Sequence, residues 1–359
     1  MLIIACISSH GFGHGARVAA VLQALHARRP DCRFILSTAL PRDFLQRCFA
    51  GLPMNVRPCQ WDVGVLQGDA LGSDPDATLM ALEHLQRNLP LLLEREGHWL
   101  AGQCRRGEAA LVLGDIPPAA ALLAKRLDLP LVWHGNFGWD SIYGAMDERF
   151  AVWSQRCLEL YRQGSALLSC PFALPMPWDL PGRSLGLGCA KPRMETDQLR
   201  ERLDWRTPRD RSALLCFGGL GLACRPAWLE SWRDWRFLVL DPALATAGNA
   251  VLVPEELRPL DVMGLCERVI TKPGFSTFCE ALHQQCGLVV VRREGFAEAA
   301  VLESSLRRHG HHRFLSRKQF DCGDWELDQP LLPPEGMPLA GGGVDQAADF
   351  LLHQLQQCP

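Results

Sequence analysis

The stretch RVITKPGFSTFCEAL, residues 268–282, decides the fold of this chain. A β-branched run followed by Pro-Gly, a Ser-Thr step and an apolar helical pattern predicts a strand, a tight turn and a helix start. The first N–H groups of a helix and the positive end of its dipole attract phosphate, and Gly274 has no side chain to block a ligand. Thr277-x-x-Glu280 also fits an ordinary capping box, in which Glu280 only closes its own helix.

Length and composition indicate a folded protein of two domains. A chain of 359 residues is too long to fold around one compact core. Its content of 48% hydrophobic and 21% charged residues indicates a large buried interior. The net charge of −3 gives no general attraction to nucleic acid or to an anionic membrane. We therefore expect no nucleic-acid partner.

The cysteines and the first strand indicate a cytoplasmic protein without a transmembrane segment. The 15 cysteines are odd in number, scattered through apolar runs and never spaced Cys-x-x-Cys, which favours reduced thiols. The apolar run at residues 2–7 has no basic leader before it and is too short to span a bilayer.

Strand and helix patterns alternate in two series along the chain. Residues 2–7 are continuously apolar, as in a strand buried on both faces of a parallel sheet, and a glycine-rich loop and a helix follow. After a proline-rich segment the rhythm restarts at residues 213–217, before a second glycine loop. We predict an α/β fold with two Rossmann-like parallel-sheet domains: residues 1–170, a linker at 171–183, residues 184–343 and a C-terminal helix at 344–359.

The first glycine loop admits another interpretation. GFGHGA, residues 11–16, fits the loose dinucleotide fingerprint Gly-x-Gly-x-x-Ala of nicotinamide and flavin enzymes. That fingerprint also requires an acidic residue at the end of the second strand, which binds the ribose hydroxyls. This chain has Leu36-Ser37-Thr38 there. The missing acid disfavours a dinucleotide enzyme.

His14 lies where this loop enters a helix, with His10 nearby. The positive end of the helix dipole disfavours the protonated imidazole, which keeps a neutral base available. Asp115 ends another predicted parallel strand and would hold the second ring nitrogen, giving a base and its orienting acid. The alternatives are loop hydrogen bonding for His14 and a helix cap for Asp115.

Four motifs together resemble one family. Residues 9–17, SHGFGHGAR, and 136–143, NFGWDSIY, resemble two signatures of the N-terminal, glycosyltransferase-like region of plant L-arabinokinase and its bacterial relatives. Residues 272–280 and 292–298 resemble the same region and, more distantly, the donor site of GT-B glycosyltransferases such as the peptidoglycan N-acetylglucosaminyltransferase and UDP-glycosyltransferases. The resemblance covers nearly the whole chain.

This resemblance implies a GT-B fold, with the acceptor bound mainly by the first domain, a nucleotide-sugar donor by the second and reaction in a cleft. His14 matches the base of inverting members, and Asp115 its orienting acid. The donor side would comprise Gly218, Gly219, Lys272, Gly274, Ser276, Thr277, Glu280, Glu294, Phe296 and Glu298, and the acceptor side His10, Gly13, Asn136, Trp139 and Asp140. Trp139 beside Tyr143 fits core packing equally well.

Within the donor set, the resemblance implies separate roles. Ser276 and Thr277 would meet the diphosphate, Glu280 the ribose hydroxyls and Glu298 the sugar hydroxyls. Lys272 stands where many UDP-glycosyltransferases carry a His-Cys-Gly-type loop, and its ammonium could serve as a point charge on phosphate. The donor is expected to be UDP-linked, with its identity open.

Sugar transfer needs an acceptor oxygen stripped of its proton and relief of charge on the departing diphosphate. A histidine base and a helix N-terminus supply both without a metal ion, so we expect neither a metal nor a cofactor. Retaining GT-B enzymes often show two glutamates eight residues apart near the donor. Glu294 and Glu303 lie nine apart, which favours inversion.

We therefore expect a glycosyltransferase that moves a sugar from a nucleotide sugar to a small or lipid-linked acceptor, and the resemblance to arabinokinase is no reason to infer kinase activity. A non-catalytic nucleotide-sugar-binding module and an epimerase or hydrolase on the same fold remain alternatives. Arg292 and Arg293 fit either a phosphate contact or a solvated edge. His309, His311 and His312 fit a surface turn better than a metal site.

Overall fold

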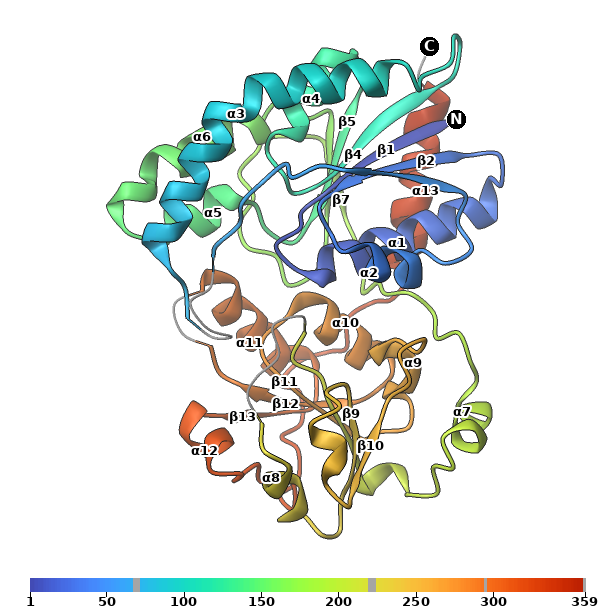
Figure 1. Cartoon of the computed structure of the whole chain (residues 1–359), viewed down its shortest axis with the longest axis vertical. Coiled ribbons are helices and arrows are strands. Elements are labelled where there is room, and N and C mark those ends of the chain that lie inside the picture. The colour runs from blue at the N-terminus through green and yellow to red at the C-terminus, as the bar shows by residue number, and fades with distance from the viewer. Residues whose placement is uncertain (67–71, 219–223, 294–295, 358–359) are drawn as a thin grey trace. The chain divides into compact units, whose positions relative to one another are not determined.

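The chain folds into two α/β units (Figure 1). The structure is a computed structural model, and it describes residues 1–66, 72–218, 224–293 and 296–357. The first unit comprises Met1–Gly188, Gly295–Glu298 and Gly342–Pro359. The second comprises Cys189–Glu294 and Ala299–Gly341. Each unit is described below by itself.

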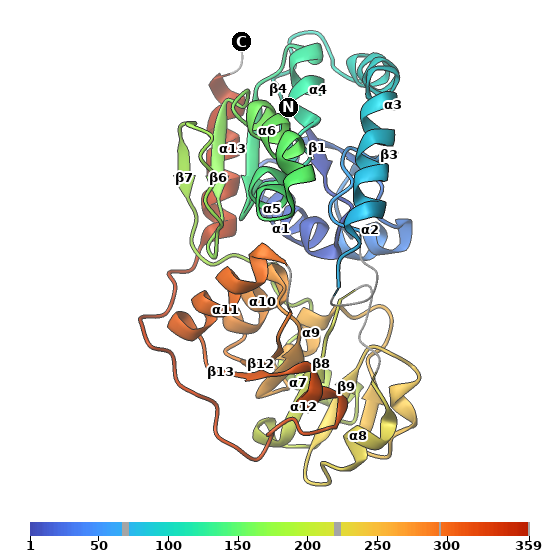
Figure 2. The ribbon, with the colours of Figure 1, turned by 90° about the vertical axis from the view of Figure 1, so that its left-hand side faces the viewer.

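The first unit is built on a seven-stranded parallel sheet in the order β3-β2-β1-β4-β5-β6-β7, with β6 and β7 visible at one edge in Figure 2. Its central strands are apolar on both faces, as a sheet covered by helices on both sides requires. The strands are β1 Leu2–Ile7, β2 Arg33–Thr38, β3 Met54–Pro58, β4 Ala110–Asp115, β5 Leu131–Gly135, β6 Ala166–Ser169 and β7 Gly182–Ser184. The helices are α1 Phe12–Arg28, α2 Arg42–Cys48, α3 Pro75–Ala101, α4 Ala120–Leu127, α5 Trp139–Gly144, the 3-10 turn η1 Glu148–Phe150, α6 Ala151–Tyr161 and α13 Gly343–Gln357.

The second unit repeats this plan with a six-stranded parallel sheet in the order β10-β9-β8-β11-β12-β13. Its strands are β8 Ser212–Leu215, β9 Arg236–Val239, β10 Ala250–Leu252, β11 Arg268–Thr271, β12 Gly287–Val291 and β13 His312–Leu315. Its helices are α7 Thr196–Arg202, η2 Arg209–Arg211, α8 Pro226–Glu230, η3 Leu244–Thr246, α9 Pro259–Met263, α10 Phe275–His283, α11 Ala297–His309, which begins in the first unit, and α12 Arg317–Asp321. Both sheets have the Rossmann order, which confirms the predicted fold class.

Strand order reverses at one place in each sheet. In the first unit β1 lies between β2 and β4, and in the second β8 lies between β9 and β11. At such a switch point the loops after the two central strands diverge, and open α/β sheets bind ligands there. The loop that carries His14 follows β1, and Asp115 pairs with Ile7 at the carboxyl ends of β4 and β1.

The proline-rich segment predicted as a linker lies inside the first unit. It connects β6 to β7, whereas the division between units falls at Gly188. Its Trp178 is buried and stacks on Tyr161 with ring centroids 4.0 Å apart, and Leu174 N donates to Asn136 O. Proline excludes regular helix and inner strand but does not prevent packing, so composition alone misplaced the boundary.

The C-terminal helix α13 packs on α1 of the first unit (Figure 1). Arg28 Nη2 and Nε donate to Asp345 and Asp349 at 2.6 and 2.8 Å. A Cβ on Gly343 would lie 2.1 Å from Gly186 O, so only glycine permits this close approach. The helix therefore belongs to the first unit and is not a separate tail.

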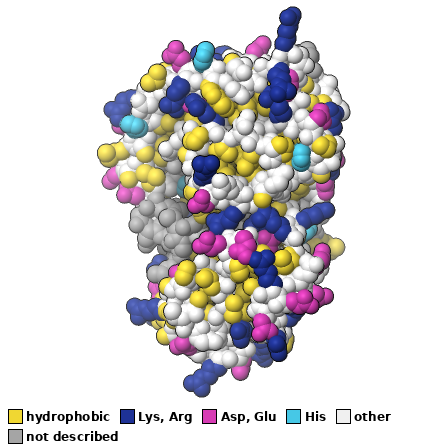
Figure 3. All heavy atoms as spheres, turned by 45° about the vertical axis from the view of Figure 1, so that its right-hand side comes forward, with side chains coloured by type: hydrophobic (Ala, Val, Ile, Leu, Met, Phe, Trp, Pro, Cys, Tyr) yellow, Lys and Arg dark blue, Asp and Glu magenta, His cyan; other side chains and the backbone are white. Residues whose placement is uncertain are grey.

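The surface carries both signs of charge. On the face shown in Figure 3, basic and acidic side chains are interspersed. In the part of the chain that the structure describes, no helix combines the length and the apolar character needed to cross a membrane.

Candidate active site

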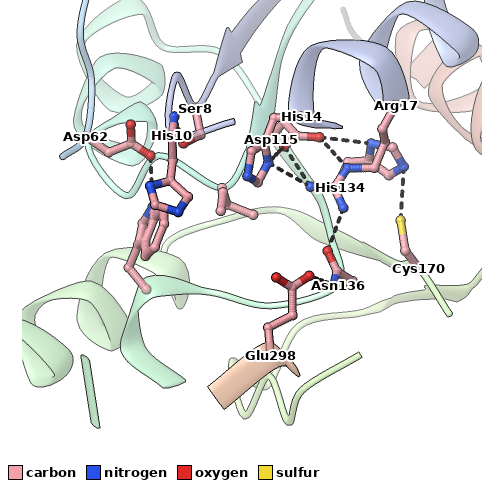
Figure 4. Close-up of polar contacts among 12 residues, drawn as sticks. Ser8, His10, His14, Arg17, Asp62, Asp115, His134, Asn136, Cys170 and Glu298 are labelled. Atoms are coloured by element: carbon pink, nitrogen blue, oxygen red, sulfur yellow. Dashed lines mark hydrogen bonds and ion pairs between the residues drawn. The ribbon is translucent and has the colours of Figure 1, made fainter. Parts of the chain in front are cut away.

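The predicted pair of His14 and Asp115 is brought together in the first unit (Figure 4). His14 is the third residue of α1, and Asp115 is the last residue of β4. Because β1 and β4 are neighbours, the end of β4 lies beside the loop that follows β1. His14 Nδ1 is 2.7 Å from Asp115 Oδ1, and both side chains are buried.

Arg17 holds the same carboxylate from the next turn of α1. Its Nε donates to Asp115 Oδ2 at 2.8 Å and its Nη2 donates to Oδ1 at 2.8 Å, a bidentate pair. Burial by itself raises the pKa of Asp115, but Arg17, His134 and His14 together outweigh burial and hold that pKa well below its ordinary value. Asp115 is therefore an anion that only accepts hydrogen bonds.

The ionised Asp115 sets the tautomer of His14. His14 Nδ1 lies 2.7 Å from a carboxylate oxygen, which can only accept, so Nδ1 must carry a proton and donate it. Arg17 Nη2 lies 3.1 Å from the same nitrogen, but a guanidinium only donates and so cannot accept this proton. In the neutral imidazole the lone pair is then on Nε2. This is the arrangement of a general base whose other nitrogen is oriented by an acid.

Asn136 and Glu298 extend the network from Arg17. Arg17 Nη1 donates to Asn136 Oδ1 at 2.7 Å, and Asn136 Nδ2 donates to Glu298 Oε1 at 2.8 Å. All three side chains are buried. The two residues that the sequence assigned to opposite substrates are thus in direct contact in the first unit.

Asp115 also lies close to a second imidazole. His134, on β5, has its Nδ1 3.6 Å from Asp115 Oδ2, and its Nε2 lies 3.4 Å from Cys170 Sγ. Burial lowers the pKa of His134, but Cys170 and Asp115 more than compensate and raise it to about 9. Burial by itself raises the pKa of the Cys170 thiol. The neighbouring His134 has the opposite effect and is stronger, so the pKa of Cys170 lies below its ordinary value.

His10 lies on the other side of His14 (Figure 4). Its ring is edge-on to Trp139, with centroids 5.1 Å apart, and stacks near Phe296 at 6.1 Å. Gly64 has φ +73° and a Cβ there would lie 2.4 Å from His10 Nδ1, so glycine makes room for the imidazole. Gly13 lies in the first turn of α1, between His10 and His14 in the chain.

Trp139 and Asp140, which the resemblance assigns to the acceptor side, are both buried in the first unit. Trp139 is fully buried, stacks on Tyr143 with centroids 5.7 Å apart and donates from Nε1 to Asp62 Oδ2 at 2.8 Å. Asp140 is also buried and accepts from Trp178 Nε1 at 3.1 Å. Both residues therefore pack in the core of the first unit, and their assignment to the acceptor side stays a prediction.

The predicted phosphate site lies at the switch point of the second sheet. Helix α10 follows β11, and its N-cap is Gly274, which offers no capping side chain. Ser276 lies in the first turn. Thr277 is the third residue of the helix and not its N-cap, so Thr277 and Glu280 do not form a capping box at this end. Gly274 has extended backbone, and an added Cβ would meet only ordinary contacts, so its absence leaves space beside the helix start.

Two charged groups beside this helix have shifted pKa values. Burial, aided by Arg293, lowers the pKa of Lys272 to about 8. Burial raises the pKa of Glu280 to about 7, against the opposing effect of Arg258. Shifts of this size are common where a site is built to bind charge.

The remaining donor-side predictions divide between the units. Gly218 follows β8 with φ +73°, a conformation that favours glycine, and no atom lies within 4 Å of an added Cβ. Phe296 and Glu298 belong to the first unit. Gly219 and Glu294 lie outside the described residues.

Several polar clusters have structural roles. Asp74 and Asp76 form an Asp-x-Asp spacing, but Asp74 caps α3 by accepting from Ala77 N and Asp76 pairs with Arg149. Arg292 pairs with Glu303 at 3.5 Å. Among the described residues, the histidines at 309–312 included, no group of three or more His, Cys, Asp or Glu could hold a metal ion.

Sequence reasoning missed four residues of this network. Arg17 lies three positions after His14 and so on the same helix face, a signal present in the sequence. Asp62 comes from an irregular segment after β3, His134 from β5 and Cys170 from the residue after β6. All three lie at or beyond the carboxyl halves of parallel strands, and only the strand order brings them together.

Comparison with known proteins gives one related sequence. No protein-family model matches the chain. L-arabinokinase of Arabidopsis thaliana is 26% identical over 329 residues, which cover 89% of this chain and 31% of the plant protein. The chain thus spans less than a third of that relative's length.

Solved structures with a similar fold include several UDP-glycosyltransferases. Medicago truncatula UGT71G1 complexed with UDP-glucose has a TM-score of 0.63 at 12% identity, over 99% of this chain and 94% of that chain. A Polygonum tinctorium UDP-glucosyltransferase has a TM-score of 0.61 at 16% identity, over 99% and 93%. Phytolacca americana UGT2 complexed with UDP-2-fluoro-glucose and pterostilbene has a TM-score of 0.59 at 14% identity, over 99% and 94%. The likeness shows that the chain has the GT-B fold.

Proposed function

We propose that this protein is an inverting glycosyltransferase that moves a sugar from a UDP-linked donor to a hydroxyl-bearing acceptor. The observation that carries the proposal is the 2.7 Å contact between His14 Nδ1 and Asp115 Oδ1 at the switch point of the first sheet. The fold supports it, since two of the similar structures hold UDP-sugars.

In the proposed reaction, His14 Nε2 takes the proton of the acceptor hydroxyl. The acceptor oxygen attacks the anomeric carbon while the bond from that carbon to the diphosphate oxygen breaks, so the sugar is transferred with inversion. Asp115 stabilises the imidazolium that forms, because it remains ionised beside Nδ1. Arg17 fixes Asp115 in place through two hydrogen bonds and so orients the base indirectly.

The second unit would bind the donor and stabilise the leaving diphosphate. The N-terminus of α10, with Ser276 and Thr277 in its first turn, suits an anion. Lys272 would add a point charge, and Glu280 would meet the ribose hydroxyls. These groups supply charge relief without a metal ion, which we propose is not required.

Two measurements test this function. Thermal-shift screening with UDP, GDP, ADP and their sugars should show stabilisation by UDP compounds, because a ligand that binds only the folded state raises the melting temperature. Turnover should then be followed as UDP release in the presence and absence of acceptors, with EDTA as a control. Tight UDP-sugar binding without any sugar transfer across a broad acceptor panel would contradict the proposal and favour a binding module.

A further inference from the structure

The two carboxylate oxygens of the buried residue Asp62 differ in their hydrogen bonding. It is 4% exposed and lies on the segment that follows β3. Its Oδ2 accepts from Trp139 Nε1 at 2.8 Å, but Oδ1 has no hydrogen-bond partner among the described residues. A buried polar atom without a partner is destabilising, and more so when the group carries charge. A hydrogen-bond donor carried by a bound ligand would remove this cost at Asp62.

Asp62 is placed toward the proposed base. Figure 4 shows Asp62 and His10 together on the side of His14 that is opposite to Cys170. Burial raises the pKa of Asp62 against the opposing effects of Ser8 and Trp139, and His14 and Asp115 also act on this pKa electrostatically. A group bound to Asp62 Oδ1 would thus belong to the same molecule as a hydroxyl presented to His14.

The same two segments also line a pocket whose side chains are apolar. Val65 follows Asp62 by three positions, and Ile142 follows Trp139 by three. These residues line a pocket of about 270 Å³ together with Ala145, Met146, Phe296 and Ala297, all in the first unit. An apolar cavity of about 150 Å³ admits benzene, so this pocket has room for a one-ring body. His10 connects the two features, because its ring contacts both Trp139 and Phe296.

We propose that Asp62 Oδ1 accepts a hydrogen bond from a hydroxyl or ammonium group of the acceptor, whose one-ring apolar body occupies the adjoining pocket. The substrate class is therefore a small amphipathic acceptor with a second hydrogen-bond donor besides the hydroxyl that is glycosylated. This inference rests on the proposed function for its meaning, but its test measures binding and needs no turnover.

Asp140 provides a matched control within the same unit. Like Asp62, it is a buried acid that accepts one indole N–H, in its case from Trp178, and its Oδ1 likewise has no hydrogen-bond partner among the described residues. Its Oδ1 lies over the backbone of Gly138, where an added Cβ would be 2.3 Å away, and so faces the core. Replacing Asp140 perturbs a comparable buried acid without touching the proposed subsite.

The experiment compares three probes of one size by calorimetric titration of the full chain. The probes are 4-ethylphenol, tyrosol, which adds a terminal hydroxyl, and tyramine, which adds a terminal ammonium. One of the two donor-bearing probes should bind at least about tenfold more tightly than 4-ethylphenol, as a hydrogen bond to a buried charged group allows. Asp62→Leu should abolish that preference, whereas Asp140→Leu should retain it. Asp62→Asn, nearly isosteric, should lose a tyramine preference but keep much of a tyrosol preference.

The outcomes separate the two claims. Equal affinity for all three probes, no binding by any of them, or a preference that survives in Asp62→Leu would overturn the subsite. Melting temperatures of the variants show that they fold, and Asp62→Asn serves where Asp62→Leu does not. UDP binding and UDP release, measured separately on the wild-type chain, decide the transferase function, so either claim can fail while the other stands.

Discussion

Replacing Asp115 with Asn tests whether the buried network orients a base or only holds the fold together. The carboxylate accepts from His14 at 2.7 Å and from Arg17 twice at 2.8 Å. An amide has one accepting oxygen, so its NH₂ group must face either Arg17 Nε or both Arg17 Nη2 and the His14 Nδ1–H. Either choice leaves a buried guanidinium without its counter-ion, which costs about 3–5 kcal/mol of stability.

The effect on catalysis should exceed the effect on stability. When the acid is lost, His14 is no longer held in the tautomer that leaves Nε2 basic, and kcat should fall by about 100- to 10,000-fold. The assay is UDP release at saturating donor, with the melting temperature measured by calorimetry on the same sample. The temperature of the assay must lie below the onset of unfolding of the variant.

Glu96→Gln is the matched control for this prediction. Glu96 is fully buried in the first unit and is held by Arg57 at 2.7 Å and by Arg95 at 2.8 Å, away from His14. Its replacement should lower stability by about 1–3 kcal/mol, less than for Asp115 because both arginines reach solvent. It should leave kcat near the wild-type value. If Asp115→Asn retains turnover as well as Glu96→Gln does, the orienting role is refuted.

Three further predictions concern other parts of the chain. Burial raises the pKa of Glu280 to about 7, so the folded chain holds this proton to higher pH than the unfolded chain does, and stability falls as pH rises through 7. Glu280→Gln should therefore raise the melting temperature at pH 8 and not at pH 4. An equal gain at both pH values would contradict this explanation. Lys272 has a pKa of about 8 and loses its charge above that pH, so UDP affinity measured by titration calorimetry should decline from pH 7 to 9. Lys272→Met should reduce the UDP affinity about tenfold at pH 7 and leave uridine binding unchanged, because the lysine charge would act on the phosphates. Trp178→Ala should destabilise the first unit by about 3–5 kcal/mol in urea unfolding, because a buried aromatic side chain is removed from its core; a negligible loss would restore the proline-rich segment as a linker.

The sequence was sufficient where function depends on regular elements. A buried strand, a glycine loop and a helix predict where His14 lies, and the end of another parallel strand predicts Asp115. Because strand ends of a parallel sheet meet at one edge, their pairing followed without knowledge of side-chain positions. The strand, turn and helix start around Gly274 were predictable for the same reason.

The sequence was insufficient where packing decides the role of a side chain. The motif NFGWDSIY left both an acceptor-side role and core packing open for Trp139, and only the structure shows that Trp139 and Asp140 on α5 are buried. Asp62 comes from an irregular segment with no periodicity, so nothing local signals that it meets Trp139. The contact between Asn136 and Glu298 joins residues 162 positions apart and depends on tertiary structure alone.

The proposed function depends most directly on His14 acting as the base. The deciding measurement is the single-turnover rate of sugar transfer by wild-type and His14→Ala chains, each saturated with the UDP-sugar that binds best. We expect unchanged donor affinity, a rate at least about 100-fold lower in the variant, and an inverted anomeric configuration in the wild-type product. Equal rates in the two chains, or a product with retained configuration, would contradict the account.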